Sequence, residues 1–126
     1  MIMYILTIIL LLYIAMLCRS LVHNLLHHYN DFAIKWKIKN HNWWNPAVSW
    51  KNKYNADGTR NKKMVQFSDA FHTFNTIELG AYAIIIAILI CLWLGLAWYF
   101  GVAVFLITGV ILMPLFFNLG YDRIFR

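Results

Sequence analysis

Charged side chains are absent from two long stretches of this 126-residue chain, residues 1–17 and residues 79–119. Only 13% of all residues are charged, whereas 62% are hydrophobic. A soluble domain of this size cannot bury so much apolar surface. The sequence therefore predicts an all-α membrane protein and argues against a soluble globular domain.

Other features are also scarce or missing. The chain has two cysteines, Cys18 and Cys91. The transmembrane helices predicted in the next paragraph place them near opposite faces of the bilayer. A disulfide between them is not expected, because its two ends must lie within a few ångströms of each other. The sequence contains no CxxC pair, no Gly-rich phosphate loop and no Ser or Cys nucleophile motif. Without these motifs, the sequence gives no indication of a dithiol redox enzyme, a nucleotide-binding protein or an enzyme with a Ser or Cys nucleophile.

The uncharged stretches predict three transmembrane helices, because one span needs about 20 residues and the second stretch is long enough for two. Gly95 and the Trp98–Gly101 cluster mark the expected hairpin between the second and third spans. The first span is expected to be a retained anchor, because it lacks the basic segment of a signal peptide. We expect three regions: the first transmembrane helix with its cytoplasmic extension (1–30), an interfacial segment (31–67), and a transmembrane hairpin with a short tail (68–126).

Basic residues are distributed unevenly along the chain. Nine of the eleven lie in residues 19–78, and the other two are Arg123 and Arg126 in the tail. The positive-inside rule then predicts an outside N-terminus and a cytoplasmic C-terminus in a multi-pass membrane protein, bacterial or phage-encoded. The expected partners of this basic loop are anionic lipid headgroups, with no nucleic acid among them, because no nucleic-acid motif accompanies the charge.

The interfacial segment shows a period of two in its apolar residues. In "FAIKWKIK", small or basic residues alternate with the apolar residues Phe32, Ile34, Trp36 and Ile38. The segment "AVSWKNKY" shows the same alternation. This pattern is typical of strands and predicts a small β-hairpin on the headgroups, with an irregular interfacial loop as the alternative. The four tryptophans of this segment suit an aromatic belt at the membrane surface.

The second predicted span begins at a polar stretch, with Ser68 as the expected N-cap. At helical spacing, one stripe carries polar residues near its start and small residues further on; it consists of Asp69, His72, Thr73, Thr76, Gly80, Ala83, Ala87 and Cys91. Small residues four apart let membrane helices approach closely, so Asp69 and His72 should face the bundle. Glu78 falls on the opposite side, where it should snorkel to the interface or meet another chain.

Histidines and carboxylates suggest a candidate metal site. His23 and His27 share a helix face with Asp31, whereas His28 is turned about 100° away from His27 on a regular helix. Together with Asp69 and His72, these imidazoles could bind one Zn or Fe ion through nitrogen and oxygen ligands. The alternative is ordinary hydrogen bonding between helix ends. His23-x-x-x-His27-His28 also resembles one histidine box of membrane di-iron desaturases, but five histidines are too few for that family.

A second resemblance rests on three segments: "WWNPAVSWKNKY" (43–54), "SDAFHTF" (68–74) and "FNLGYDRIF" (117–125). They resemble a group of small bacterial integral membrane proteins without an established activity. In that group an N-P-x-x-S-W-x-N-K segment precedes D-x-x-H at the start of a membrane helix. The resemblance implies one site, which it pairs with a single histidine best matched by His28. The implied members are Asn45, Pro46, Ser49, Trp50, Asn52, Lys53, Asp69 and His72.

Three classes of function follow from these observations. The first is a subunit of a homo- or hetero-oligomeric membrane assembly with a His/Asp polar site at the cytoplasmic interface. The second is a small metal-dependent enzyme acting on a lipid or a lipid-linked substrate. The third is a holin-like pore former, which the long Trp-rich loop disfavours. Self-association is expected, because three spans provide little core of their own.

Overall fold

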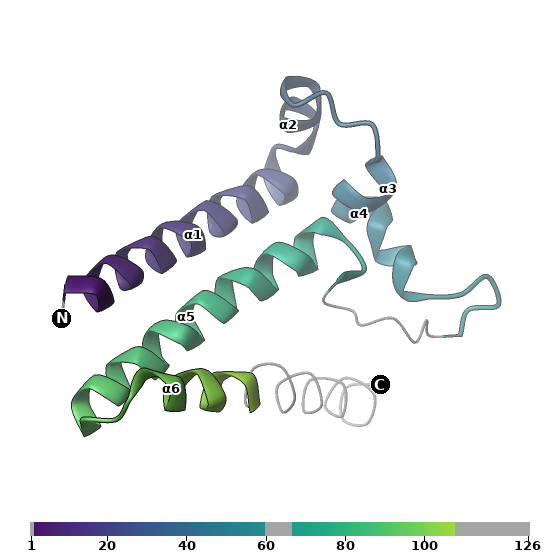
Figure 1. Ribbon diagram of the computed structural model, residues 1–126. Coiled ribbons are helices and arrows are strands. Elements are labelled where there is room, and N and C mark those ends of the chain that lie inside the picture. Colours follow the sequence, from purple (N-terminus) through teal and green to yellow (C-terminus); the bar gives the residue numbers. More distant parts are fainter. Residues whose placement is uncertain (1, 60–66, 108–126) are drawn as a thin grey trace. The chain divides into compact units, whose positions relative to one another are not determined.

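The computed structural model describes residues 2–59 and 67–107, apart from the side chain of Trp98. These residues contain no β-strand, so the predicted all-α class is confirmed. Figure 1 shows the helices in chain order: α1 (Ile2–His27), α2 (Tyr29–Lys35), α3 (His41–Trp44), α4 (Pro46–Ser49), the 3₁₀ helix η1 (Trp50–Lys53), α5 (Ala70–Leu94) and α6 (Trp98–Phe105).

Two of these helices, α1 and α5, are long and apolar enough to cross a membrane, each with a mean hydropathy of 2.4. Helix α6, which lies where a third span was predicted, has eight residues and is not among these two candidates. The rest of the predicted third span lies outside the described residues, as do the tail residues of the resemblance. The described part of the chain thus contains two candidate spans and the first turns of the third segment.

The chain divides into two compact units. One comprises Tyr13–Leu79 and contains the second half of α1, the short helices and the first turns of α5. In this unit α1 buries one side, formed by Ala15, Cys18, Val22 and Leu25. Their spacing of three or four residues is that of a single helix face. The other unit comprises Met1–Leu12 and the residues from Gly80 onward.

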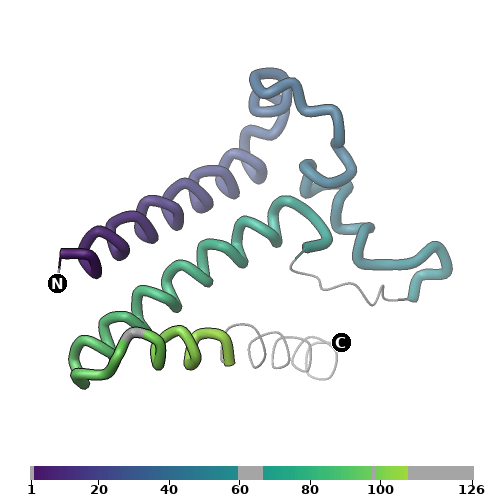
Figure 2. Tube along the Cα trace, viewed as in Figure 1, coloured from purple at the N-terminus to yellow at the C-terminus, as the bar shows by residue number. Residues whose placement is uncertain are grey.

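Helix α1 ends earlier than the sequence suggests. The first helix and its extension were predicted to run over residues 1–30, but α1 ends at His27, and α2 starts two residues later. His28 interrupts the helix with backbone angles of φ −135° and ψ 31°. Backbone hydrogen bonds still cross the interruption, from His28 N to Asn24 O and from Phe32 N to His28 O. The chain therefore changes direction between α1 and α2, as Figure 2 shows, while its backbone hydrogen bonding continues.

The predicted β-hairpin in the interfacial segment is wrong. Its first half forms helix α2, which ends in hydrogen bonds from Lys37 N to Ile34 O and from Ile38 N to Ala33 O. These bonds form a Schellman motif, with Lys37 in the left-handed conformation (φ 51°) that glycine normally supplies. Local i-to-i+4 bonds and the buried Ala33 favour the helix, because an isolated hairpin buries too little to be stable.

The second half of the segment is also helical. Pro46 occupies the first turn of α4, and the Asn45 side chain caps this helix by accepting a hydrogen bond from Ala47 N. Pro at the start of a helix costs no hydrogen bond, and Asn is a favoured N-cap. The Asn-Pro pair, which lies between the two halves of the predicted hairpin, is thus a helix start. Helix α4 then continues into η1.

In the other unit, the chain turns at Gly95 as predicted, whereas the Trp98–Gly101 cluster lies in α6 and not in the turn. Gly95 has a φ of 65°, and Leu96 N donates to Cys91 O, which closes α5 with a Schellman motif. Ala87 and Cys91 belong to the predicted small-residue stripe and are buried. Gly101 of α6 lies against both, and a Cβ at this glycine would meet Cys91 Sγ at 2.9 Å. The small residues therefore allow close packing within this chain.

Candidate functional site at the start of helix α5

Asp69 caps helix α5. Its Oδ1 accepts a hydrogen bond from His72 N at 2.8 Å, the bond that an N-cap residue makes to the third residue of a helix. The sequence predicted Ser68 as the N-cap, and this is wrong by one residue. Ser68 instead donates through its Oγ to Asp69 Oδ2 at 3.2 Å. A carboxylate at this position also interacts favourably with the positive end of the helix dipole.

The same carboxylate orients the imidazole of His72. Its Nδ1 lies 2.8 Å from Asp69 Oδ1 and 3.0 Å from Oδ2. Burial by itself raises the pKa of Asp69, but the hydrogen bonds from the His72 side chain and backbone outweigh it and hold the pKa below its usual value. A carboxylate can only accept a hydrogen bond, so Nδ1 carries the proton and Nε2 of the neutral ring carries the lone pair.

Lys53 occupies the remaining nitrogen of this imidazole. Its Nζ lies 3.1 Å from His72 Nε2 and donates to it. Lys53 ends η1 and His72 lies in the first turn of α5, so the contact joins two elements nineteen residues apart. Asp69, His72 and Lys53 form a continuous polar chain, here called the polar triad. The resemblance places all three residues in one site, and the structure brings them together.

Asn52 fixes η1 beside the polar triad. Its Nδ2 donates to Asn42 O at 2.8 Å and to Ser68 O at 3.0 Å. Ser49, just before η1, is buried. Both are residues of the resembling segment, and the two bonds of Asn52 tether η1, which ends at Lys53. Trp50 is different: its ring is exposed, stacks edge-on with Tyr54 and lies under Lys51 Nζ at 5.9 Å.

The histidines of the first helix form a separate group. The His23 ring lies 4.8 Å from that of His27 and 5.7 Å from that of His28. His28 was expected to point elsewhere, but the helix break lets it turn toward His23. All three rings are exposed. Only Asp69 and His72, of the five predicted ligands, make a hydrogen bond to each other.

The predicted metal site is not formed by these residues. In the described part of the chain, no group of three or more His, Cys, Asp or Glu side chains has an arrangement that could hold a metal ion. The physical reason lies at His72, whose Nε2 would be the metal-binding atom. The positive charge of Lys53 is next to that nitrogen. Zn or Fe coordination by His23, His27, His28, Asp69 and His72 together is therefore wrong.

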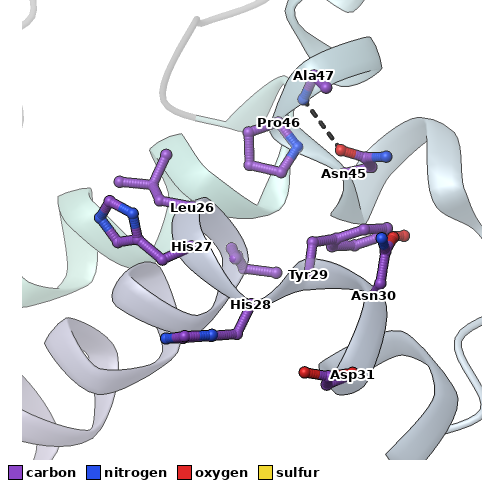
Figure 3. Close-up of a pocket in the computed structure, with 10 residues that line it drawn as sticks. Leu26, His27, His28, Tyr29, Asn30, Asp31, Asn45, Pro46 and Ala47 are labelled. Atoms are coloured by element: carbon purple, nitrogen blue, oxygen red, sulfur yellow. Dashed lines mark hydrogen bonds between the residues drawn. The ribbon is translucent and has the colours of Figure 1, made fainter.

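A polar cleft of about 470 Å³ lies at the break between α1 and α2. Figure 3 shows His27 and His28 on one side of it and Asn45 with Pro46 on the other. Asp31 lines the same cleft. The amide oxygen of Asn45 is used by its hydrogen bond to Ala47 N, which Figure 3 marks. This cleft separates the histidine group from the α4 side of the implied site.

Glu78 is not on an outward face. Its carboxylate is only 3% exposed, and its Oε1 lies 3.0 Å from Arg19 Nε of α1. The alignment is that of an ion pair and not of a directed hydrogen bond. The expectation that Glu78 snorkels or meets another chain is therefore wrong. The spacing of residues along α5 shows which side of that helix Glu78 occupies, but it cannot show that Arg19 of α1 lies there.

Comparison of the chain with protein-family models, curated proteins and solved structures finds no match. The geometry alone thus carries the functional argument. The sequence indicated Asp69, His72 and Lys53 as site residues, but it revealed neither the direct contact between His72 and Lys53 nor a role for Arg19. The one available signal for Arg19 was its position, because it is the first charged residue of the chain.

Proposed function

We propose that this protein is an integral membrane protein whose polar triad is an acid–base site for the polar end of a lipid or lipid-linked molecule. The observation that carries the proposal is the position of His72 between the Asp69 carboxylate and the Lys53 ammonium. The site needs no metal. It keeps the predicted location of the chemistry and replaces the predicted cofactor with Lys53.

The location of the triad supports an amphiphilic ligand. Asp69 directly precedes α5, a helix that is apolar enough to cross a membrane. In a bilayer, the start of such a helix lies near the boundary between headgroups and hydrocarbon. A ligand whose polar end reaches His72 can keep its apolar part beside α5. We place this boundary on the cytoplasmic side, where the basic residues gather.

The chemistry of the triad supports proton transfer. Asp69 keeps the proton of His72 on Nδ1 and stabilises the imidazolium that forms when Nε2 accepts a second proton. Lys53 holds Nε2 until a ligand arrives. An anionic group such as a phosphate attracts the ammonium of Lys53, and this frees the lone pair of Nε2 to accept a proton from the ligand or from a bound water.

The test is ¹⁵N NMR of the full chain with labelled histidine, in bilayers of phosphatidylcholine with and without phosphatidylglycerol. We expect the resting spectrum to show His72 protonated on Nδ1. Phosphatidylglycerol should shift the Nε2 signal of His72. Lys53→Gln should shift the same signal in phosphatidylcholine bilayers that contain no phosphatidylglycerol. His41, whose Nδ1 faces a tyrosine hydroxyl, is the internal control. If neither phosphatidylglycerol nor Lys53→Gln changes the His72 signals, the proposal is overturned.

A second role, as a subunit of a membrane assembly, is supported by how little the membrane helices bury. In α1 and α5 only 17% and 22% of the most apolar window is buried. Dispersion contacts with other helices stabilise membrane bundles, so a second copy or a partner could supply what these helices lack. Native mass spectrometry in mild detergent tests self-association, and a strictly monomeric species at all concentrations argues against it.

A further inference from the structure

We infer that Arg19 binds the phosphate group of a membrane lipid through the two terminal nitrogens of its guanidinium. This site is separate from the polar triad and does not depend on the acid–base proposal. One atom of the Arg19 guanidinium meets Glu78. It is Nε, the inner nitrogen of the guanidinium, that lies 3.0 Å from Glu78 Oε1.

The outer edge of the guanidinium is open. Within the described residues, Nη1 and Nη2 of Arg19 take part in no ion pair or hydrogen bond, and the Arg19 side chain is 65% exposed. These two nitrogens are the ones whose parallel N–H bonds match two oxygens of a phosphate. The buried carboxylate therefore holds the inner side of the fork and leaves the phosphate-binding side directed outward.

The depth of Arg19 in the chain identifies the anion. Residues 1–18 carry no charge, and at about 1.5 Å per residue they extend for about 27 Å. This is close to the hydrocarbon thickness of about 30 Å, so Arg19 reaches the level of the headgroups. Glu78, the last charged residue before the second uncharged stretch, lies at the same level because it pairs with Arg19. Lipid phosphate is the most abundant anion at this depth.

Glu78 gives the site its geometry. A lone arginine near lipid samples many rotamers, whereas the ion pair with a buried carboxylate restricts them before the lipid binds. His23 lies one helical turn beyond Arg19 on the same face of α1 and is exposed, so its ring nitrogen can donate to the same phosphate. The ligand class is thus a phosphodiester headgroup, with Arg19 as its main contact and Glu78 as a positioning residue.

Dipolar NMR between ¹⁵N-labelled arginine and lipid ³¹P tests the contact directly, with the unmodified full chain in phosphatidylglycerol and phosphatidylcholine bilayers. The signals of Arg19 are those that disappear in Arg19→Lys. We expect lipid phosphorus to dephase its Nη signals. Arg19 signals that are visible but not dephased overturn the inference, and so does dephasing that appears only after inorganic phosphate is added.

Lipid retention gives an independent readout. After washing in detergent, Arg19→Lys should retain about tenfold less phosphatidylglycerol than the unmodified protein at limiting lipid, because lysine keeps the charge but loses the fork. Lys35→Gln, which removes one exposed positive charge from α2, should retain as much as the unmodified protein. Equal losses in the two variants would indicate general charge attraction and overturn the inference. His72 signals distinguish this outcome from failure of the acid–base proposal.

Discussion

Oδ1 of Asp69 accepts two hydrogen bonds from the same residue, His72, one from the backbone N and one from Nδ1, both at 2.8 Å. The start of α5 and the orientation of the imidazole are therefore fixed by one atom. A substitution that disturbs the helix cap also disturbs the chemistry of the ring. This coupling makes the site testable by stability measurements as well as by spectroscopy.

Asp69→Asn should make the protein less dependent on pH in the acid range. The pKa of Asp69 is lower in the folded protein than in the unfolded chain. Its stabilising contribution is thus present above the unfolded pKa of about 4 and is lost as pH falls through the folded pKa. Asparagine can still cap α5, but it loses the charge, so we expect a loss of about 1–2 kcal/mol at neutral pH. Thermal unfolding across the acid range measures both effects.

Asp57→Asn is the matched control for this experiment. Hydrogen bonds from the side chain and backbone of Thr59 lower the pKa of Asp57 too, but this carboxylate is fully exposed. Solvent screens such a group, so its substitution should leave unfolding nearly unchanged. An equal response of the two variants would contradict the role assigned to the buried carboxylate.

Asn52→Ala should loosen the segment that carries Lys53. The side-chain amide of Asn52 donates to two backbone oxygens, Asn42 O and Ser68 O. Removing both bonds leaves two acceptors without this donor and should cost about 1–3 kcal/mol. The expected result is a lower unfolding midpoint together with a His72 spectrum like that of Lys53→Gln. Asn55→Ala, which removes one exposed bond to Thr59 Oγ1, should change neither.

The all-α class and the two apolar helices could be predicted from the sequence, because long runs without charge have few structural interpretations. The site was predictable only in part. Asp69 and His72 could be placed together from their spacing, because residues three apart share a helix face. Lys53 and Arg19 could not be paired with their partners, because both contacts join elements that are distant in the sequence.

The interfacial segment was mispredicted for a physical reason. Alternation in "FAIKWKIK" indicates a strand only if another strand is available to pair with it. The structure instead forms local backbone hydrogen bonds. Lys37 adopts a left-handed backbone conformation, which a lysine in the sequence does not predict. Asn45 and Pro46 carried the correct signal for a helix start, but the same pair is also common in turns.

Tyr29→Phe should weaken the contact between α2 and α3. Tyr29 Oη lies 2.6 Å from His41 Nδ1, and burial raises the pKa of this tyrosine. Loss of the bond should cost about 1 kcal/mol and speed hydrogen exchange at Trp43 N and Trp44 N, which donate to Asn40 O. In Tyr54→Phe, exchange at both amides should stay as in the unmodified protein, because the ring of Tyr54 contacts Trp50 and the substitution keeps that ring. Unchanged exchange in Tyr29→Phe would mean that other contacts hold α3.

Gly101→Ala should disturb the packing of α6 on α5, whereas Gly80→Ala should be tolerated. A Cβ at Gly101 would lie 2.9 Å from Cys91 Sγ and 3.2 Å from Ala87 O, and the second contact is with backbone that cannot move aside. A Cβ at Gly80 would meet only Phe105 Cζ at an ordinary 3.9 Å. Overpacking of this kind costs about 1–3 kcal/mol.

The readouts for the glycine pair are thermal unfolding and the rate at which a maleimide reagent modifies Cys91, a free and buried thiol. Gly101→Ala should lower the unfolding midpoint and raise that rate, because α6 must move away from the thiol. Replacing Cys91 with alanine in the Gly101→Ala background removes the closest contact and should restore part of the stability, while the contact with Ala87 O keeps the rescue incomplete. If Gly80→Ala and Gly101→Ala behave alike, the close approach of α6 to the small residues of α5 is not what stabilises this unit.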